Sequence, residues 1–592
     1  MRLTRISKAV AVGAAAAMAL SACAASTGTN NSSSAGSEAA SGGEIRVVET
    51  NIFSSLNPDT PNGNTDINSK IAYTTQWDFN YITNDLKVQK NEQFGNYEVV
   101  SEDPFTVKYT INEGVTWSDG EAIDADDMLF AWAVFSGHFD DAKLDENGEV
   151  ESGTSYFNYA GDTTGLGLTK TPVVGDDNRS VTLEYTKPFA DWEIAFGITT
   201  PAHIAAKKAD ITTEELSKLI LETPKGDPEK PAKANATVKK VADFYNTGYE
   251  TKTLPSDPDL LVASGPFMVK DMVADQSMTL VRNEKFNWGP QPKVDSIVVK
   301  YIGEAPAQIA ALKNGEADII APQPSSDTLE QIEAIGDTVA VNVDEQLSYD
   351  HLDLSFNSEV FKDKAVREAF LKTIPRKQIV DSVVGDLDNE AVPLDSQMFV
   401  PANEGYAGSV EANGSSEYAE PDIAGAKELL DGKTPTVRIL YNSGNPNRVD
   451  TYALIEESAT QAGFKIEDGG DAAWGDKLGD GTYDASIFGW ISPGVGVSGV
   501  PQIFKTGGGG NYSAYSNKSV DALADEIIST PDPARQTEIQ QEIDKHLFED
   551  AYGLPLFQAK NLDAYSTSVE GLKSMPNQTG VWWNFWEWSL KQ

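Results

Sequence analysis

Residues that could perform catalysis or hold a metal ion are few in this chain, and they are not spaced for either task. Its four histidines, His138, His203, His351 and His546, form no i,i+4 pair and match no zinc-type spacing. No Gly-x-Ser-x-Gly turn occurs, and the glycine run 507–510 is followed by Asn-Tyr-Ser instead of the Lys-Ser/Thr of a phosphate loop. We therefore expect no catalytic residues, no cofactor and no metal. A pair of carboxylates that hydrolyses glycosidic bonds is not excluded by the sequence, because the distance between the two groups is set by the fold.

Cys23 is the only cysteine, and its surroundings indicate lipid attachment. Arg2, Arg5 and Lys8 precede an apolar run over 9–20, and Leu-Ser-Ala-Cys closes it. This is the layout of a secretory signal, and its ending resembles a lipobox, in which cleavage before the cysteine is followed by acylation. The alternatives are a buried structural cysteine or a membrane span, but a span needs about 20 apolar residues. We expect a signal peptide over 1–22 and a lipid anchor at the outer face of the cytoplasmic membrane.

The segment after Cys23 is expected to be a flexible tether. Residues 24–43 are almost entirely Ala, Ser, Thr, Gly and Asn, which offer too little apolar surface to offset the entropy of ordering. A coil of this length spans roughly 25 Å by the scaling of Gly/Ser-rich linkers. The folded body can therefore stand clear of the bilayer.

The charge and size of the chain narrow the partners and the fold. With 46 Lys and Arg against 90 Asp and Glu, the net charge is -44, which disfavours nucleic acid. A length of 592 residues predicts more than one domain, in a chain that we expect to be monomeric. Strand-like runs alternate with helical ones, which indicates an α/β fold. Strands are expected at 44–49, 105–111, 297–301 and 437–441, and helices at 124–135, 305–314, 363–370 and 449–462.

The segment 109–132, YTINEGVTWSDGEAIDADDMLFAW, resembles the extracytoplasmic solute-binding proteins of the peptide and nickel class, the oligopeptide-binding proteins of ABC importers. Other segments similar to this family follow in its order, as expected for an actinobacterial-type lipoprotein. They are 55–58, 264–267, 282–283, 314–318, 356–357, 366–369, 426–430, 483–490 and 554–556. The resemblance thus extends over nearly the whole chain after the tether.

The resemblance implies a two-lobed periplasmic-binding-protein-like fold of type II, in the large cluster with an extra subdomain on lobe I. Lobe I would take 44–90, 191–310 and 556–592, the subdomain 91–190, and lobe II 311–555. The lobes would close by a hinge motion around a ligand, and a membrane permease would read the closed form.

The resemblance also implies the ligand contacts. An oligopeptide would add as an extra strand, since main-chain hydrogen bonds are blind to sequence. The segments 51–53 and 489–492 would pair with its backbone, and aromatic residues would wall the cleft. For Tyr156 and Phe557, core packing is the competing interpretation. The expected ligand-binding residues are Asn51, Ile52, Phe53, Tyr156, Asn442, Trp474, Gly489, Trp490, Ile491, Ser492 and Phe557.

One departure from the family pattern concerns the ligand's amine. Relatives that take free peptides usually have an Asp three residues after the Trp of this segment, where this chain has Pro493. Either another acid such as Asp476 or Asp480 serves the amine, or the ligand has none. Lys477 is the candidate partner for a ligand carboxylate. Trp582, Trp583, Trp586 and Trp588 fit either sugar stacking or core packing.

Three functional hypotheses follow. The first is a lipid-anchored receptor that delivers oligopeptides to an ABC importer. The second is the same kind of receptor for an oligosaccharide or another solute, which Pro493 motivates. The third is a surface hydrolase or adhesin, which only the density of acidic residues favours.

Overall fold

A computed structural model describes residues 42–591 except 145–149, 162 and 492–494. Cys23, Ser492 and Pro493, which carried sequence-based predictions, lie outside the described residues. Within the part described, no helix combines the length and apolarity needed to cross a bilayer.

A ten-stranded mixed sheet organises the fold. In spatial order its strands are β10 (Phe267–Val273), β11 (Ser277–Arg282), β12 (Ser296–Tyr301), β1 (Glu44–Glu49), β13 (Ile319–Ile320), β18 (Gly553–Ser566), β14 (Val339–Leu354), β17 (Ala485–Ile491), β15 (Thr436–Asn442) and β16 (Lys465–Asp471). β1 is parallel to β12 and β13, and β15 is parallel to β16 and β17. The expected strands at 44–49, 297–301 and 437–441 are confirmed.

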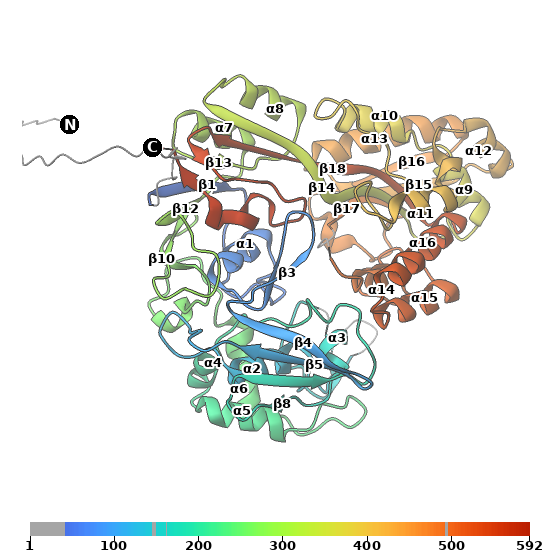
Figure 1. Ribbon diagram of the computed structural model, residues 1–592. Coiled ribbons are helices and arrows are strands. Elements are labelled where there is room, and N and C mark those ends of the chain that lie inside the picture. Colours follow the sequence, from blue (N-terminus) through green and yellow to red (C-terminus); the bar gives the residue numbers. More distant parts are fainter. Residues whose placement is uncertain (1–41, 145–149, 162, 492–494, 592) are drawn as a thin grey trace, which may run out of the picture. The chain divides into compact units, whose positions relative to one another are not determined.

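The long strands β14 and β18 join the two halves of this sheet. Near Ile319 and Ile320 β18 pairs with β13, and at the other end β14 pairs with β17 from Ser348 to Leu354. Their mutual register shifts between Glu345 and Tyr349 and again between Asp350 and His351. Figure 1 shows both strands running from the β1 and β13 side into the β17 and β15 side. We call β14 and β18 the connecting strands.

A smaller four-stranded sheet lies between residues 95 and 184. Its strands are β4 (Gly95–Glu102), β5 (Phe105–Ile111), β9 (Ser180–Glu184) and β8 (Val173–Val174). The expected strand at 105–111 is confirmed. Three two-stranded ribbons complete the strands: β2 (Asn80–Ile82) with β3 (Val88–Lys90), β6 (Lys143–Leu144) with β7 (Val150–Ser152), and β19 (Val569–Glu570) with β20 (Ser589–Leu590).

The helices begin and end largely where their sequences predict. Asp124 caps α2 (Ala125–Phe135) in a capping box with Asp127, and Thr212 caps α5 (Thr213–Glu222) in the same way. Gly463 ends α13 (Pro446–Ala462) with φ at +110°, a backbone conformation that favours glycine. The remaining helices are α1 (Asp66–Thr75), α3 (Thr164–Gly167), α4 (Ala202–Lys208), α6 (Ala236–Thr247), α7 (Ala305–Lys313), α8 (Ser326–Glu333), α9 (Lys364–Leu371), α10 (Arg376–Val383), α11 (Tyr406–Ala412), α12 (Ile423–Leu430), α14 (Gly499–Phe504), α15 (Lys518–Ile528) and α16 (Pro533–Glu549). Short 3₁₀ turns are η1 (Pro258–Leu261), η2 (Ser415–Tyr418), η3 (Trp474–Lys477) and η4 (Gly580–Glu587).

Three apolar cores hold these elements together. The largest combines side chains of 45–319 with side chains of 497–588, and a second spans 352–557. The third joins Val48 to Ile309, Ile320 and Ala564. Residues 311–320 thus pack with β1, although the sequence placed the start of the second lobe at residue 311.

The WSDG motif is structural in this fold. The indole of Trp117 donates to the Asp127 carboxylate at 3.2 Å, and the amide of Ala202 donates to its other oxygen at 2.8 Å. Burial raises the pKa of Asp127 to about 7. The motif therefore connects the end of β5 with α2 and α4.

Candidate functional site

An edge of β17 is open where the family resemblance expects a ligand backbone. Residues Ala485–Ile487 lie between β14 and β15, but β15 pairs no further than Ile487. β14 continues to pair with β17 as far as Ile491. Among the described residues, the second edge of 488–491 therefore has no strand partner. In an antiparallel pair every second residue directs its N–H and C=O away from the partner, so these groups can accept an added strand.

The segment 51–53 after β1 offers a second set of free main-chain groups. Within the described part of the chain, its backbone N–H and C=O groups form no intramolecular hydrogen bond. Ile52 is 44% exposed. The side-chain amide of Asn51 donates to the Asp66 carboxylate at 2.8 Å. The Phe53 side chain is buried and fixes the segment to the core. Exposed polar backbone of this kind needs water or a ligand as its partner.

Aromatic rings gather on one face of β17 and β14. The Trp490 ring is nearly parallel to Tyr512, with centroids 5.9 Å apart, and its edge meets Phe488 at 5.3 Å. Trp474, in η3, lies 6.1 Å from Phe488. We call Trp474, Phe488, Trp490, Tyr512 and His351 the Trp490 cluster. Trp474, Trp490 and Tyr512 are half-buried, so each keeps a surface that a ligand can contact.

His351 forms the buried base of this cluster. Its ring lies 6.2 Å from Trp490 and nearly parallel to it. Nδ1 is 2.8 Å from Asp353, whose other oxygen accepts from the Tyr552 hydroxyl at 3.1 Å. The Asp353 carboxylate thus fixes the orientation of the imidazole ring. Within the residues that the structure describes, Nε2 is buried and has no partner.

An ion pair lies directly beneath β17 at Gly489. Arg448 Nε and Nη2 each lie 3.2 Å from an oxygen of Asp350, and the guanidinium also lies 5.1 Å from the Trp474 ring. A Cβ at Gly489 would stand 2.6 Å from the Asp350 carboxylate, so a larger residue there would displace the ion pair. Sequence reasoning missed both charged residues, because their 98-residue separation leaves no local signal.

Other predicted contacts fall in different surroundings. Asn442, at the end of β15, is half-buried and accepts from the Gly444 amide at 2.9 Å. Tyr156 is 8% exposed, and its hydroxyl accepts from the Asn235 amide. Phe557 is 4% exposed and belongs to the second core. Tyr156 and Phe557 were predicted to wall a cleft, and their burial instead supports the core interpretation.

The charged alternatives near the Trp490 cluster are largely committed to local contacts. Lys477 pairs with Asp471. Asp480 accepts from the Thr482 amide and hydroxyl at 2.8 and 2.7 Å. Asp476 is exposed on η3. Lys477 and Asp480 are thus already engaged, which leaves Asp476 as the less restrained of the acids considered.

The four C-terminal tryptophans are packing residues. Trp582 and Trp588 are 0% exposed, and Trp583 and Trp586 are 6% and 7% exposed. Their rings pack against one another and against Trp77 and Phe585. Stacking on a sugar ring would need an open face, so the core alternative is confirmed.

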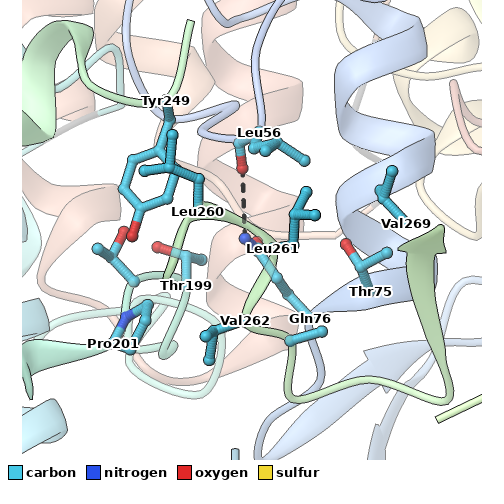
Figure 2. A pocket seen from close by; sticks show the side chains of 12 residues that line it. Leu56, Thr75, Gln76, Thr199, Pro201, Tyr249, Leu260, Leu261, Val262 and Val269 are labelled. Atoms are coloured by element: carbon cyan, nitrogen blue, oxygen red, sulfur yellow. Dashed lines mark hydrogen bonds between the residues drawn. The ribbon is translucent and has the colours of Figure 1, made fainter. Parts of the chain in front are cut away.

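A small cavity beside Tyr249 and Leu261 cannot hold a solute. Its volume is about 20 Å³, the space of a single water. Figure 2 shows the side chains around it and the hydrogen bond from Gln76 to the Leu56 carbonyl, 3.4 Å long. Among the described residues, no group of three His, Cys, Asp or Glu side chains is placed to hold a metal ion.

Comparisons with known proteins identify the family of the chain. The model of "Bacterial extracellular solute-binding proteins, family 5 Middle" matches residues 77–512. The oligopeptide-binding protein OppA of Mycobacterium tuberculosis is 24% identical over 495 residues, covering 80% of this chain and 73% of the relative. An uncharacterised lipoprotein of the same organism is 24% identical over 577 residues, covering 94% of each.

Solved structures show the same fold. The periplasmic EDTA-binding protein EppA superposes with a TM-score of 0.80 at 22% identity, covering 94% of this chain and 97% of its own. The expected two-lobed, type II periplasmic-binding-protein-like α/β fold is thereby confirmed. With the family model matching most of its length, the chain belongs to the bacterial extracellular solute-binding proteins of family 5.

Proposed function

We propose that this protein is the lipid-anchored substrate-binding component of an ABC importer, and that it captures oligopeptides by their backbone and delivers them to the membrane permease. The observation that carries the proposal is the pair of open main-chain edges at 51–53 and 488–491. Both would hydrogen-bond an extended chain whatever its side chains are. Trp474, Trp490 and Tyr512 would wall the site.

The connecting strands β14 and β18 would act as the hinge. Irregular register between Glu345 and Tyr349 interrupts the ladder at the point where the sheet passes from one half to the other. We therefore move the proposed lobe boundaries to about 346 and 559. Residues 311–345 join lobe I because β13 and the start of β14 pair beside β1. We extend the subdomain to the end of α6, since α4 and α5 pack on α2 and α6 packs on α4.

A second contact between the proposed lobes involves Asp191. Its carboxylate accepts from the amides of Val497 and Ser498 at 2.9 and 2.8 Å and from the Ser498 hydroxyl at 2.6 Å. The amide of Ala190 donates to the Ile528 carbonyl at 2.8 Å. These bonds join the segment after the small sheet to α14 and α15. They would form when the lobes close.

Calorimetric titration of the mature chain with a pool of short peptides tests the proposal. We expect binding that does not depend on one particular side chain. Binding of a sugar or metal chelate with no binding of any peptide would overturn the oligopeptide assignment.

A different solute is the second candidate. Pro493 replaces the usual amine-binding Asp, and EppA, which has the same fold, is an EDTA-binding protein by name. Mass spectrometry of the ligand retained through purification separates the two candidates. Because the family is one of substrate-binding proteins, we propose transfer of the ligand without chemical change.

The lipid anchor at Cys23 is part of the proposal. A relative that matches over 94% of both chains is named a lipoprotein, and this name supports the lipid anchor. The anchor would hold the protein at the outer face of the cytoplasmic membrane, close to the permease.

A further inference from the structure

A second, larger cavity lies beside the β2–β3 ribbon. It has a volume of about 270 Å³, enough for a side chain or a small amine. The end of α1, strand β2, the segment 194–197 and the loop 575–579 enclose it. Its walls include Tyr73, Asp78, Tyr81, Phe196, Met575 and Asn577.

Asp78 is the only ionisable carboxylate or amine among the residues that line this cavity. Its oxygens accept from the Ile198 amide at 3.1 Å and from the Asn80 amide at 3.4 Å. The Phe79 amide also donates to this carboxylate. A carboxylate can accept about four hydrogen bonds, so it keeps capacity for one more. A Cβ at Gly197 would stand 2.6 Å from Oδ2, and glycine there leaves the carboxylate space.

No positive charge compensates Asp78. In the described part of the chain it has no lysine, arginine or histidine partner, and the nearby Asp59 adds negative charge. Burial raises the pKa of Asp78 to about 6 despite the amide donors. Burial disfavours the charged form of this group, and a carboxylate without a positive partner is costly to ionise there.

Aromatic side chains stand around this acid. Tyr73 donates its hydroxyl to the Trp583 carbonyl at 2.9 Å, which holds its ring in place. Tyr81 lies 5.5 Å from both Trp77 and Trp586. Rings beside a carboxylate favour a cation, because the ring faces and the carboxylate are both negative.

A hydrogen bond connects the wall of the cavity to β14, one of the proposed hinge strands. The carbonyl of Pro576, between the lining residues Met575 and Asn577, accepts from the Leu347 amide at 2.7 Å. Two residues further along β14, Tyr349 pairs with Trp490. The stretch of β14 that supports the cavity wall is therefore continuous with the stretch that supports the Trp490 cluster.

We propose that the Asp78 cavity is a subsite for a cationic group of the transported ligand, an ammonium or a guanidinium. Asp78 supplies the counter-charge, and Tyr73 and Tyr81 supply aromatic walls. This inference rests on the proposed function and narrows its substrate class. Asp78, in the proposed lobe I, would pair with the ligand's amine. In relatives that take free peptides, this is usually the role of an Asp at the position where this chain has Pro493.

The test uses one peptide pool in two forms, untreated and with its amines acetylated. We expect the wild-type mature chain to retain the untreated peptides at least tenfold better, as read by affinity mass spectrometry. Asp78→Asn should reduce that preference to within about twofold while still binding acetylated peptides. Asn resembles the neutral acid that burial favours, so this variant should fold, and equal melting temperatures would verify that. Asp176→Asn, at an exposed acid, is the matched control.

The results separate this inference from the proposed function. An equal preference in wild type and Asp78→Asn, or no preference in wild type, would overturn the subsite. If neither pool binds, the oligopeptide proposal fails, and saturation-transfer NMR with phenethylammonium then tests the cavity alone. Transfer seen in wild type and lost in Asp78→Asn supports the subsite, and transfer absent or unchanged overturns it. Tyr81→Leu, which keeps the charge, should weaken that transfer without abolishing it.

Discussion

Asp191→Ala is expected to weaken closure of the lobes. The side chain accepts three hydrogen bonds from Val497 and Ser498, two from main-chain amides and one from a hydroxyl. Val497 is 5% exposed, so its amide would lose its partner where water has little access. A truncation here removes the carboxylate from the proposed closing contact and leaves the connecting strands β14 and β18 untouched.

The expected effect can be worked from these bonds. Hydrogen bonds to a charged group contribute roughly 1.5–3 kcal/mol each, and bonds that share one carboxylate are not additive. A net loss of about 3 kcal/mol corresponds to roughly 150-fold, since each 1.4 kcal/mol is tenfold. In the proposed mechanism ligand binding is coupled to closure, so we expect affinity to fall by about two orders of magnitude.

Two measurements check this prediction. Calorimetry gives the affinity for a bound peptide, and small-angle X-ray scattering gives the radius of gyration with and without it. Asp191→Ala should stay more extended than wild type at equal peptide concentration. Asp176→Ala, which removes an exposed acid from the turn between β8 and β9, should behave as wild type. Unchanged affinity and compaction would refute the closing role, and a collapse of the melting temperature would show a permanent packing contact.

The remaining predictions concern the cleft, the anchor and pH. Trp490→Ala should weaken peptide binding by tenfold or more, with the ligand-free melting temperature within a few degrees of wild type; a large drop would place this ring in the core. Cys23→Ser should release the protein from membranes without changing affinity, and membrane retention in fractionation would contradict the anchor. Burial raises the pKa of Asp127 to about 7 and that of Asp563 to about 6, so the folded chain binds more protons than the unfolded one between about pH 4 and 7. The stability that these neutral acids contribute is present below that pH window and is lost as pH rises through it, on the order of 1 kcal/mol per pH unit. The melting temperature should therefore be higher at pH 5 than at pH 8. The opposite trend would count against these pKa shifts.

Local patterns predicted most elements of the fold. The alternation over 105–111 and the acidic start of the helix at 124–127 are properties of neighbouring residues, and both are confirmed in β5 and α2. The hinge that we propose lies at other positions than the resemblance implied. Its position depends on which strands pair with β14 and β18, and sequence periodicity carries no information on pairing partners.

The candidate site could be predicted only in part. Motif position pointed to Trp474 and Trp490, which the structure brings into one cluster. The Arg448–Asp350 ion pair and the Asp78 cavity arise where segments far apart in the chain meet. For an isolated aromatic residue such as Tyr156, sequence cannot separate a ligand wall from a core position.

Mass spectrometry of the small molecules released on denaturing the purified full-length protein tests the central claim most directly. We expect short peptides at about one per protein, with the same masses before and after prolonged incubation with the native protein. Release of only sugars or chelates would contradict the ligand class. Peptides or other solutes whose covalent structure changes during incubation would contradict a carrier that delivers its ligand unaltered.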